Sequence, residues 1–390
     1  MKILMAAYGG GHVNIIVKLY RELVSRGHSP VVFGLTMAVE KLEKEEVPYI
    51  SYVDFLDNEK EEVFKVGEDL CREMSLNNAI SLEETVSYMG INYLELISSH
   101  GKKKAEEIYS KEGRQSFLPL QFASKVLDKI SPDIVIATNS PRTEEALIRV
   151  AMKKGVATYV VNDFYDEEEM QKRTGEVDYC TKMFVALDGT RKKLLDYGWD
   201  PDNILLSGNP VFDSIHEPIL PEVRKCFLKE FNPGSKKIIL WVKSIFHVFE
   251  QAERETETRL IDLVSNDDSY VLLIKPHPND PRVYQDCLNC RYLLNDSILV
   301  HDLLKLIDVV VTVNSTVGLE ANILGKPVVQ IATFDYAQKI PFEKLGIGKE
   351  VTDFSQLVDL LKEEVENGGT VERTTYPKNA TKFIVDEILK

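Results

Sequence analysis

The chain has 390 residues, of which 28% are charged, and a formal net charge of −15. Two or three domains are expected, because this length exceeds one typical hydrophobic core. The negative charge argues against nucleic-acid binding, although a local basic patch could still allow peripheral membrane association. The sequence contains no apolar run of roughly 18 residues, no signal-peptide h-region and only five scattered cysteines, which favours a cytoplasmic protein.

The first residues predict a strand, a tight turn and a helix. Residues 2–7 are mostly apolar, and three glycines follow them: Gly9, Gly10 and Gly11. Apolar residues then recur at helical spacing over 15–26, and residues 30–34 read as a second strand. In such a βαβ unit the turn lies at the carboxyl end of the first strand, where open α/β sheets bind ligands. His12 would open the helix, so we expect its imidazole to face a ligand.

Residues 54–115 differ from their surroundings because they are charged, helical in pattern and poor in strand signals. We interpret them as a helical insertion in the first domain. The insertion could shape an acceptor pocket or a homodimer contact.

Strands and helices alternate after the insertion, which predicts a parallel, doubly wound sheet. The expected strands are residues 133–138, 158–162, 181–186 and 204–207. Ser140 and Arg142 follow the first of these strands and are candidate acceptor contacts. Asp163 follows the second, where a carboxylate could act as a base or orient His12.

Residues 214–235 contain three prolines and predict a linker into a second α/β domain. The expected domains are residues 1–213 and 214–376, with a final helix at 377–390 that could pack back on the first domain. In the second domain, strands are expected at 236–242, 270–275 and 297–300.

Residues 309–329 read as a buried strand, a helix and a further strand. N-cap residue types separate the first strand from the helix: Asn314, Ser315 and Thr316. A helix N-terminus at a strand's carboxyl end favours a phosphate. Lys275 and His277 end another strand of the same domain, in the sequence KPHP, and could reach the same anion.

These motifs together resemble the nucleotide-sugar enzymes of the GT-B architecture, in which two Rossmann-like domains face a cleft. GGGHVN at 9–14 is similar to the glycine turn of lipid-intermediate and natural-product glycosyltransferases. Residues 184–213 are similar to a domain junction that those transferases share with UDP-N-acetylglucosamine 2-epimerases. KPHP, with NSTVGLEANILGKPV, is similar to bacterial capsule-type transferases.

The resemblance implies an inverting glycosyltransferase of bacterial surface-polysaccharide synthesis. It would move a sugar from a UDP- or CMP-linked donor to a glycan or lipid-linked acceptor. The first domain would hold the acceptor and the second the nucleotide sugar, with the Glu320 carboxylate on the ribose. His12 is the first choice for the base, Asp163 the second, and neither an essential metal nor a cofactor is expected.

Two alternatives stay open, a UDP-N-acetylglucosamine 2-epimerase-like hydrolase and a nucleotide-sugar-binding protein without catalysis. The hydrolysing epimerases usually carry a DSGG-type turn where this chain has residues 314–317, NSTV. They also carry a His-Arg pair where this chain has residues 243–247, KSIFH. Both departures favour the transferase.

Overall fold

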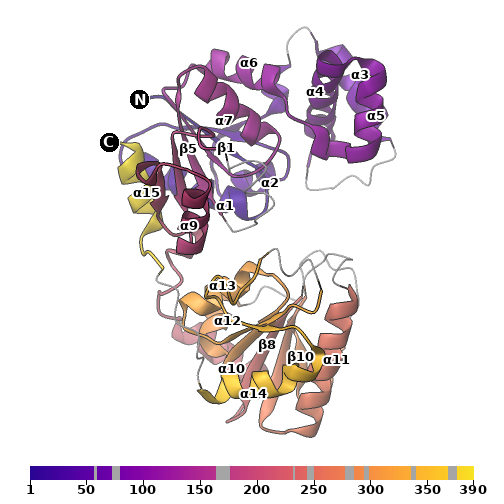
Figure 1. Ribbon diagram of the computed structural model, residues 1–390, viewed down its shortest axis with the longest axis vertical. Helices are drawn as coiled ribbons and strands as arrows, with labels where there is room; N and C mark the ends of the chain where they lie inside the picture. Colours follow the sequence, from indigo (N-terminus) through magenta and orange to yellow (C-terminus); the bar gives the residue numbers. More distant parts are fainter. Residues whose placement is uncertain are drawn as a thin grey trace. The chain divides into compact units, whose positions relative to one another are not determined.

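The structure is a computed structural model that describes residues 1–56, 59–72, 80–163, 176–231, 233–243, 250–276, 285–293, 298–334, 340–367 and 376–390. The chain divides into two compact units, which are Met1–Asp213 with Pro377–Lys390, and Ser214–Tyr376. Each unit is a parallel sheet flanked by helices (Figure 1), which confirms the predicted doubly wound α/β class.

In the described part of the first unit, the sheet has seven strands in the order β3-β2-β1-β4-β5-β6-β7, all parallel. They are β1 (Ile3–Ala7), β2 (Val31–Gly34), β3 (Tyr49–Ile50), β4 (Ile134–Thr138), β5 (Ala157–Asn162), β6 (Lys182–Val185) and β7 (Ile204–Leu206). The chain runs outward from β1 in one direction and from β4 in the other. The carboxyl ends of β1 and β4 therefore form a topological switch point, where ligands bind in open sheets.

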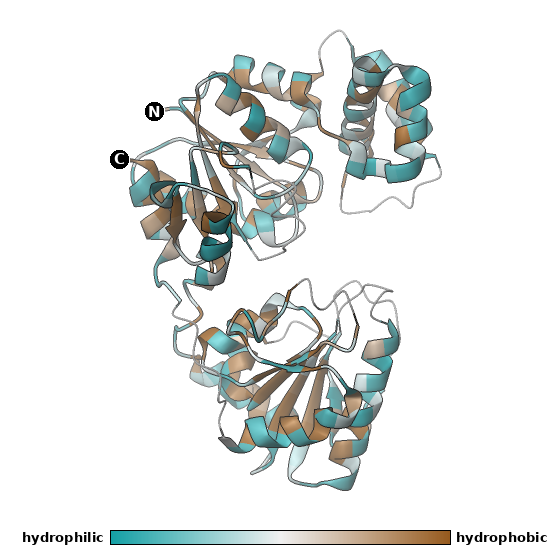
Figure 2. Cartoon of the chain, viewed as in Figure 1, coloured by the Kyte–Doolittle hydropathy of each residue, from teal (hydrophilic) through white to brown (hydrophobic). Residues whose placement is uncertain are grey.

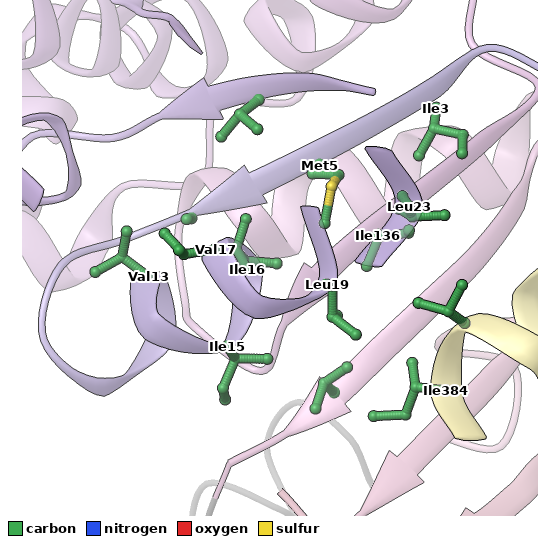
Figure 3. Packing of buried hydrophobic residues seen from close by; sticks show 14 of the residues in the cluster. Ile3, Met5, Val13, Ile15, Ile16, Val17, Leu19, Leu23, Ile136 and Ile384 are labelled. Atoms are coloured by element: carbon green, nitrogen blue, oxygen red, sulfur yellow. The ribbon is translucent and has the colours of Figure 1, made fainter. Parts of the chain in front are cut away.

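Six helices flank this sheet in the part of the unit that the structure describes: α1 (Gly11–Ser25), α2 (Ala38–Lys44), α6 (Leu120–Ile130), α7 (Thr143–Lys153), α9 (Asp188–Asp196) and α15 (Ala380–Ile388). The apolar face of α1 packs on β1 and β4, and Ile384 of α15 joins the same core (Figure 3). The Asp213 carboxylate accepts hydrogen bonds from the backbone N–H groups of Ala380 at 2.7 Å and Thr381 at 2.9 Å. These two bonds and the shared core hold the C-terminal helix in the first unit.

The insertion consists of α3 (Lys60–Cys71), α4 (Leu82–His100) and α5 (Lys102–Glu112), and α4 packs against both of the others. Glycines allow α3 and α4 to approach closely. A Cβ on Gly67 would lie 2.1 Å from the Val86 carbonyl oxygen, and one on Gly90 would lie 2.1 Å from that of Val63. Both neighbours are backbone atoms, so this helix crossing requires glycine.

In the described part of the second unit, the sheet has six parallel strands in the order β10-β9-β8-β11-β12-β13. They are β8 (Lys237–Val242), β9 (Tyr270–Lys275), β10 (Cys290–Tyr292), β11 (Val309–Thr312), β12 (Val328–Ile331) and β13 (Lys349–Val351). The helices are α10 (Pro221–Phe231), α11 (Glu250–Asn266), α12 (Val300–Leu306), α13 (Thr316–Ile323) and α14 (Leu357–Asn367). Figure 2 shows apolar central strands under helices whose outer faces are polar. The switch point here lies between β8 and β11.

The prediction of a strand at 297–300 is wrong for residues 298–300, which the structure describes, because α12 begins at Val300. The edge strand beside β9 is β10, which carries the charged residue Arg291 at its centre and ends with the half-buried Tyr292. Three residues at a sheet edge bury little apolar surface, so β10 and β13 lack the pattern that identifies buried strands.

Candidate active site

The glycine turn lies at the carboxyl end of β1, and Gly9 and Gly10 each have a local reason to be glycine. Gly10 precedes α1 with φ +69°, a conformation that side chains disfavour. A Cβ on Gly9 would lie 2.3 Å from the Met37 Cβ, and one on Gly11 would lie 3.9 Å from Asp163 Oδ2. The turn is therefore compact and brings α1 close to the end of β5.

His12 is the second residue of α1, and its ring meets the ends of β4 and β5. Its Nδ1 is 2.8 Å from Thr138 Oγ1 and 3.6 Å from Asp163 Oδ2. The His12 and Asp163 side chains are each 25% exposed, so solvent reaches the pair. The sequence suggested both residues as bases without showing that they meet, and the fold brings them together.

Glu144 completes this cluster, and it was not among the site residues predicted from the sequence. It lies in the first turn of α7 and is fully buried. Its Oε1 accepts from Tyr8 N–H at 2.7 Å, and its Oε2 accepts from Thr138 N–H and Oγ1 at 2.7 Å each. Burial raises the pKa of the Glu144 carboxyl above its usual value, and nearby His12 and these hydrogen bonds offset part of that rise.

A signal for Glu144 was present in the sequence. It shares the buried face of α7 with Leu147, Ile148 and Ala151, at helical spacing. A carboxylate on such a face needs polar partners, since burying an unpaired charge is costly. The partners themselves come from β1 and β4, which are distant in sequence.

The backbone at Asp163 is held by two asparagines. Asp163 N–H donates to Asn139 Oδ1 at 3.2 Å, and Asn209 Nδ2 donates to the Asp163 carbonyl oxygen at 3.3 Å. Asn209 Oδ1 also accepts from Val211 N–H at 3.0 Å, capping the 3-10 turn Pro210–Phe212. Asn209 therefore links the β7 loop to the end of β5.

The two candidate acceptor residues occupy the β4–α7 turn. Ser140 is buried, with 4% of its surface exposed. Arg142 has φ +71°, and its guanidinium carbon lies 4.8 Å from the centre of the Tyr8 ring. Arg142 therefore packs over the aromatic residue that follows β1.

In the second unit, Ser315 is the N-cap of α13. Its Oγ accepts from Val317 N–H at 3.3 Å, and its own N–H donates to Thr312 Oγ1 at 3.3 Å. The first turn of α13, starting at Thr316, thus follows β11 directly at the switch point. A Cβ on Gly318 would lie 2.5 Å from the Phe342 ring, so α13 packs tightly there.

Lys275 ends β9 at the same edge of the second sheet. The register pairs Thr312 with Val242 and Val242 with Lys275, so the three strands end level with one another. Two strand spacings put Lys275 roughly 10 Å from the end of β11. His277 lies outside the described residues.

Glu320 is one turn into α13 and is buried, with 7% exposed. Its Oε2 is 3.0 Å from His301 Nε2, which belongs to α12. His301 was not among the predicted site residues. The sequence pointed to a carboxylate here but not to the imidazole that contacts it.

Comparisons with known proteins support this architecture. The search against protein-family models found no match. The chain is 25% identical over 273 residues to the processive diacylglycerol β-glucosyltransferase of Bacillus licheniformis, covering 70% of this chain and 60% of that relative. The chain thus matches less than two thirds of the length of that curated relative.

Many solved structures match this chain, and two of them illustrate the range of activities. The UDP-GlcNAc 2-epimerase from Neisseria meningitidis, bound to UDP-GlcNAc, has a TM-score of 0.63 at 16% identity, covering 100% of both chains. A glycosyltransferase from Rickettsia africae has a TM-score of 0.54 at 14% identity, covering 100% of this chain and 98% of its own. The chain has the GT-B fold. The resemblance to nucleotide-sugar enzymes that the motifs indicated is confirmed at this level.

The GT-B fold is shared by transferases and epimerases, so the site residues carry the rest of the argument. Across the described ranges, no three His, Cys, Asp or Glu side chains are grouped to hold a metal ion. Likewise, none of the described helices is long and apolar enough to cross a membrane.

Proposed function

We propose that the protein is an inverting, metal-independent glycosyltransferase of bacterial surface-polysaccharide synthesis, acting on a UDP- or CMP-linked sugar. The observation that carries this proposal is the placement of His12. Its imidazole lies at the switch point of the first sheet, bonded to Thr138 and close to Asp163. The similarity to diacylglycerol glucosyltransferases supports transfer to a glycan or lipid-linked hydroxyl.

In the proposed reaction, His12 acts as the general base. The acceptor oxygen forms a bond to the anomeric carbon as the bond from that carbon to the donor phosphate breaks. The acceptor proton passes to the imidazole, and the nucleotide leaves with the bonding electrons. Asp163, 3.6 Å from Nδ1, stabilises the resulting imidazolium.

The second unit would bind the donor. The first turn of α13, with Ser315 and Thr316, offers backbone N–H groups and a positive dipole end to the phosphates. Lys275 adds a cation at the same sheet edge. Glu320 would accept the ribose hydroxyls, and Asn314 lies in the turn before the helix.

The rival function is hydrolytic 2-epimerisation, because the Neisseria enzyme carries out its reaction on the same fold. Incubation with UDP-GlcNAc alone separates the two. A transferase leaves the donor largely intact without an acceptor. Release of UDP and N-acetylmannosamine in that reaction would contradict the proposal.

A donor screen tests the proposed phosphate site. UDP, CMP, CDP, GDP and their sugars are added in a thermal-shift assay, since a ligand at 100 times its Kd stabilises by about 2.7 kcal/mol. We expect one nucleotide class to raise Tm, and Ser315→Ala with Lys275→Ala to remove most of the rise. An unchanged shift in the double variant would place the phosphates elsewhere.

A further inference from the structure

We propose that Glu144 and Thr138 fix the tautomer of His12, so that Nδ1 carries the proton and Nε2 is the atom that accepts one. Neither residue contacts the reacting atoms in this scheme, so both are positioning residues. The inference rests on the proposed role of His12 as base, and it names the residues that make that base competent.

The first step concerns the charge of Glu144. Both carboxylate oxygens face backbone N–H donors, from Tyr8 on one side and Thr138 on the other. A proton on Oε1 would oppose the Tyr8 N–H, and a proton on Oε2 would compete with two Thr138 donors. All three donors are satisfied together only when the carboxylate is ionised and acts as an acceptor alone.

The second step follows from the single hydrogen of the Thr138 hydroxyl. That hydrogen is donated to Glu144 Oε2 at 2.7 Å. The hydroxyl oxygen has only lone pairs left for its other contact, which is His12 Nδ1 at 2.8 Å. The hydrogen between these two atoms must therefore belong to the ring nitrogen.

The third step is the consequence for the ring. A neutral imidazole carries one N–H, so a proton on Nδ1 leaves the lone pair on Nε2. Asp163 Oδ2 lies at 3.6 Å from Nδ1, beyond hydrogen-bond distance, so Thr138 is the nearer partner of that nitrogen. When Nε2 takes up a proton, the carboxylates of Asp163 and Glu144 both face the new positive charge.

The direct test is the tautomer itself, measured in the substrate-free protein. Nitrogen-15 NMR of histidine rings distinguishes Nδ1–H from Nε2–H, and His12→Gln identifies the His12 signals. We expect Nδ1–H in the wild type and in Thr138→Ser, which keeps the hydroxyl. Thr138→Val keeps the side-chain shape without the hydroxyl, and we expect it to shift His12 toward Nε2–H.

Thr158→Val is the matched control. Thr158 is a buried threonine on β5, and its Oγ1 accepts from Thr181 N–H at 3.0 Å, away from His12. Loss of the Thr158 hydroxyl in this variant should leave the His12 tautomer unchanged. An Nε2–H form in the wild type, or an unchanged His12 in Thr138→Val, would overturn the proposal.

A second variant changes Glu144, which accepts the hydrogen bond from the Thr138 hydroxyl. In Glu144→Gln the amide N–H₂ group faces a backbone N–H in either orientation, Tyr8 or Thr138. When the nitrogen takes the place of Oε2, it can donate to Thr138 Oγ1, which frees the hydroxyl hydrogen to point at His12 Nδ1 and favours Nε2–H. The rate of transfer should be lower in Thr138→Val than in the wild type, by at most the 10²- to 10⁴-fold that a general base contributes. Thr138→Ser should transfer at a rate close to that of the wild type. The NMR measurement needs no substrate. It therefore tests the tautomer of His12 separately from the proposed transferase activity.

Discussion

The environment of His12 is assembled from residues that are far apart in the sequence. Thr138 ends β4, Asp163 directly follows β5, and Glu144 lies in the first turn of α7. All three lie close to a histidine near the N-terminus. The strand-end position of His12 and Asp163 could be predicted, because strands and turns have local patterns. The burial of Glu144 could be predicted from the helical spacing of α7. Its contacts and those of Thr138 could not, because they depend on which strands lie side by side.

At the residue scale, the contact between His301 and Glu320 predicts an effect on donor binding. Hydrogen bonds to charged groups contribute roughly 1.5–3 kcal/mol, so loss of the imidazole should misorient the carboxylate and raise the nucleotide Kd about 10-fold or more. Calorimetric titration of His301→Ala with the nucleotide found in the donor screen measures this.

His100→Ala is the control for that variant, since His100 is an exposed residue at the end of α4. Equal nucleotide affinity in wild type and His301→Ala would show that the imidazole does not support Glu320.

At the element scale, buried strands were predictable and short edge strands were not. β11 has four fully buried residues and was expected from its valines. β10 and β13 have three residues each and are defined by pairing with a neighbour, which no local pattern encodes. The close crossing of α3 and α4 also depends on contacts between segments.

That crossing gives a stability prediction. Gly90→Ala places a methyl against the Val63 carbonyl, a backbone atom that cannot rotate away, so α3 and α4 must separate. We expect destabilisation of about 1–3 kcal/mol, the usual cost of overpacking. Chemical denaturation measures it, with Ser99→Ala on the exposed end of α4 as the control. An unchanged free energy of unfolding in Gly90→Ala would contradict the packing seen here.

The attachment of α15 gives a second prediction at this scale. Asp213→Ala removes the acceptor for two N–H groups in the first turn of α15, and losing a helix cap costs roughly 0.5–2 kcal/mol. We expect the Asp213→Ala variant to show faster amide hydrogen exchange in α15 than the wild type does, with a smaller change in the strands of the same unit. Unaltered protection of residues 380–388 would mean that core packing alone holds the helix.

At the scale of the whole molecule, the alternation of strands and helices predicted the class of fold. Each unit places the polar residues that we propose for its site at the switch point of its own sheet, where open α/β sheets bind ligands. The choice between transferase and epimerase lies outside the pattern of elements, because both activities occur on this fold. It depends on individual side chains such as His12 and on the turn at 314–317.

The central claim is that His12 serves as the base of an acceptor-dependent, inverting transfer. The measurement is nucleotide release from the bound donor, with and without the proposed glycan and lipid-linked acceptors, together with the anomeric configuration of the product. We predict acceptor-dependent release, an inverted product, and a loss of about 10²- to 10⁴-fold in His12→Gln with donor binding retained. Acceptor-independent release, a retained configuration, or full activity in His12→Gln would contradict the account.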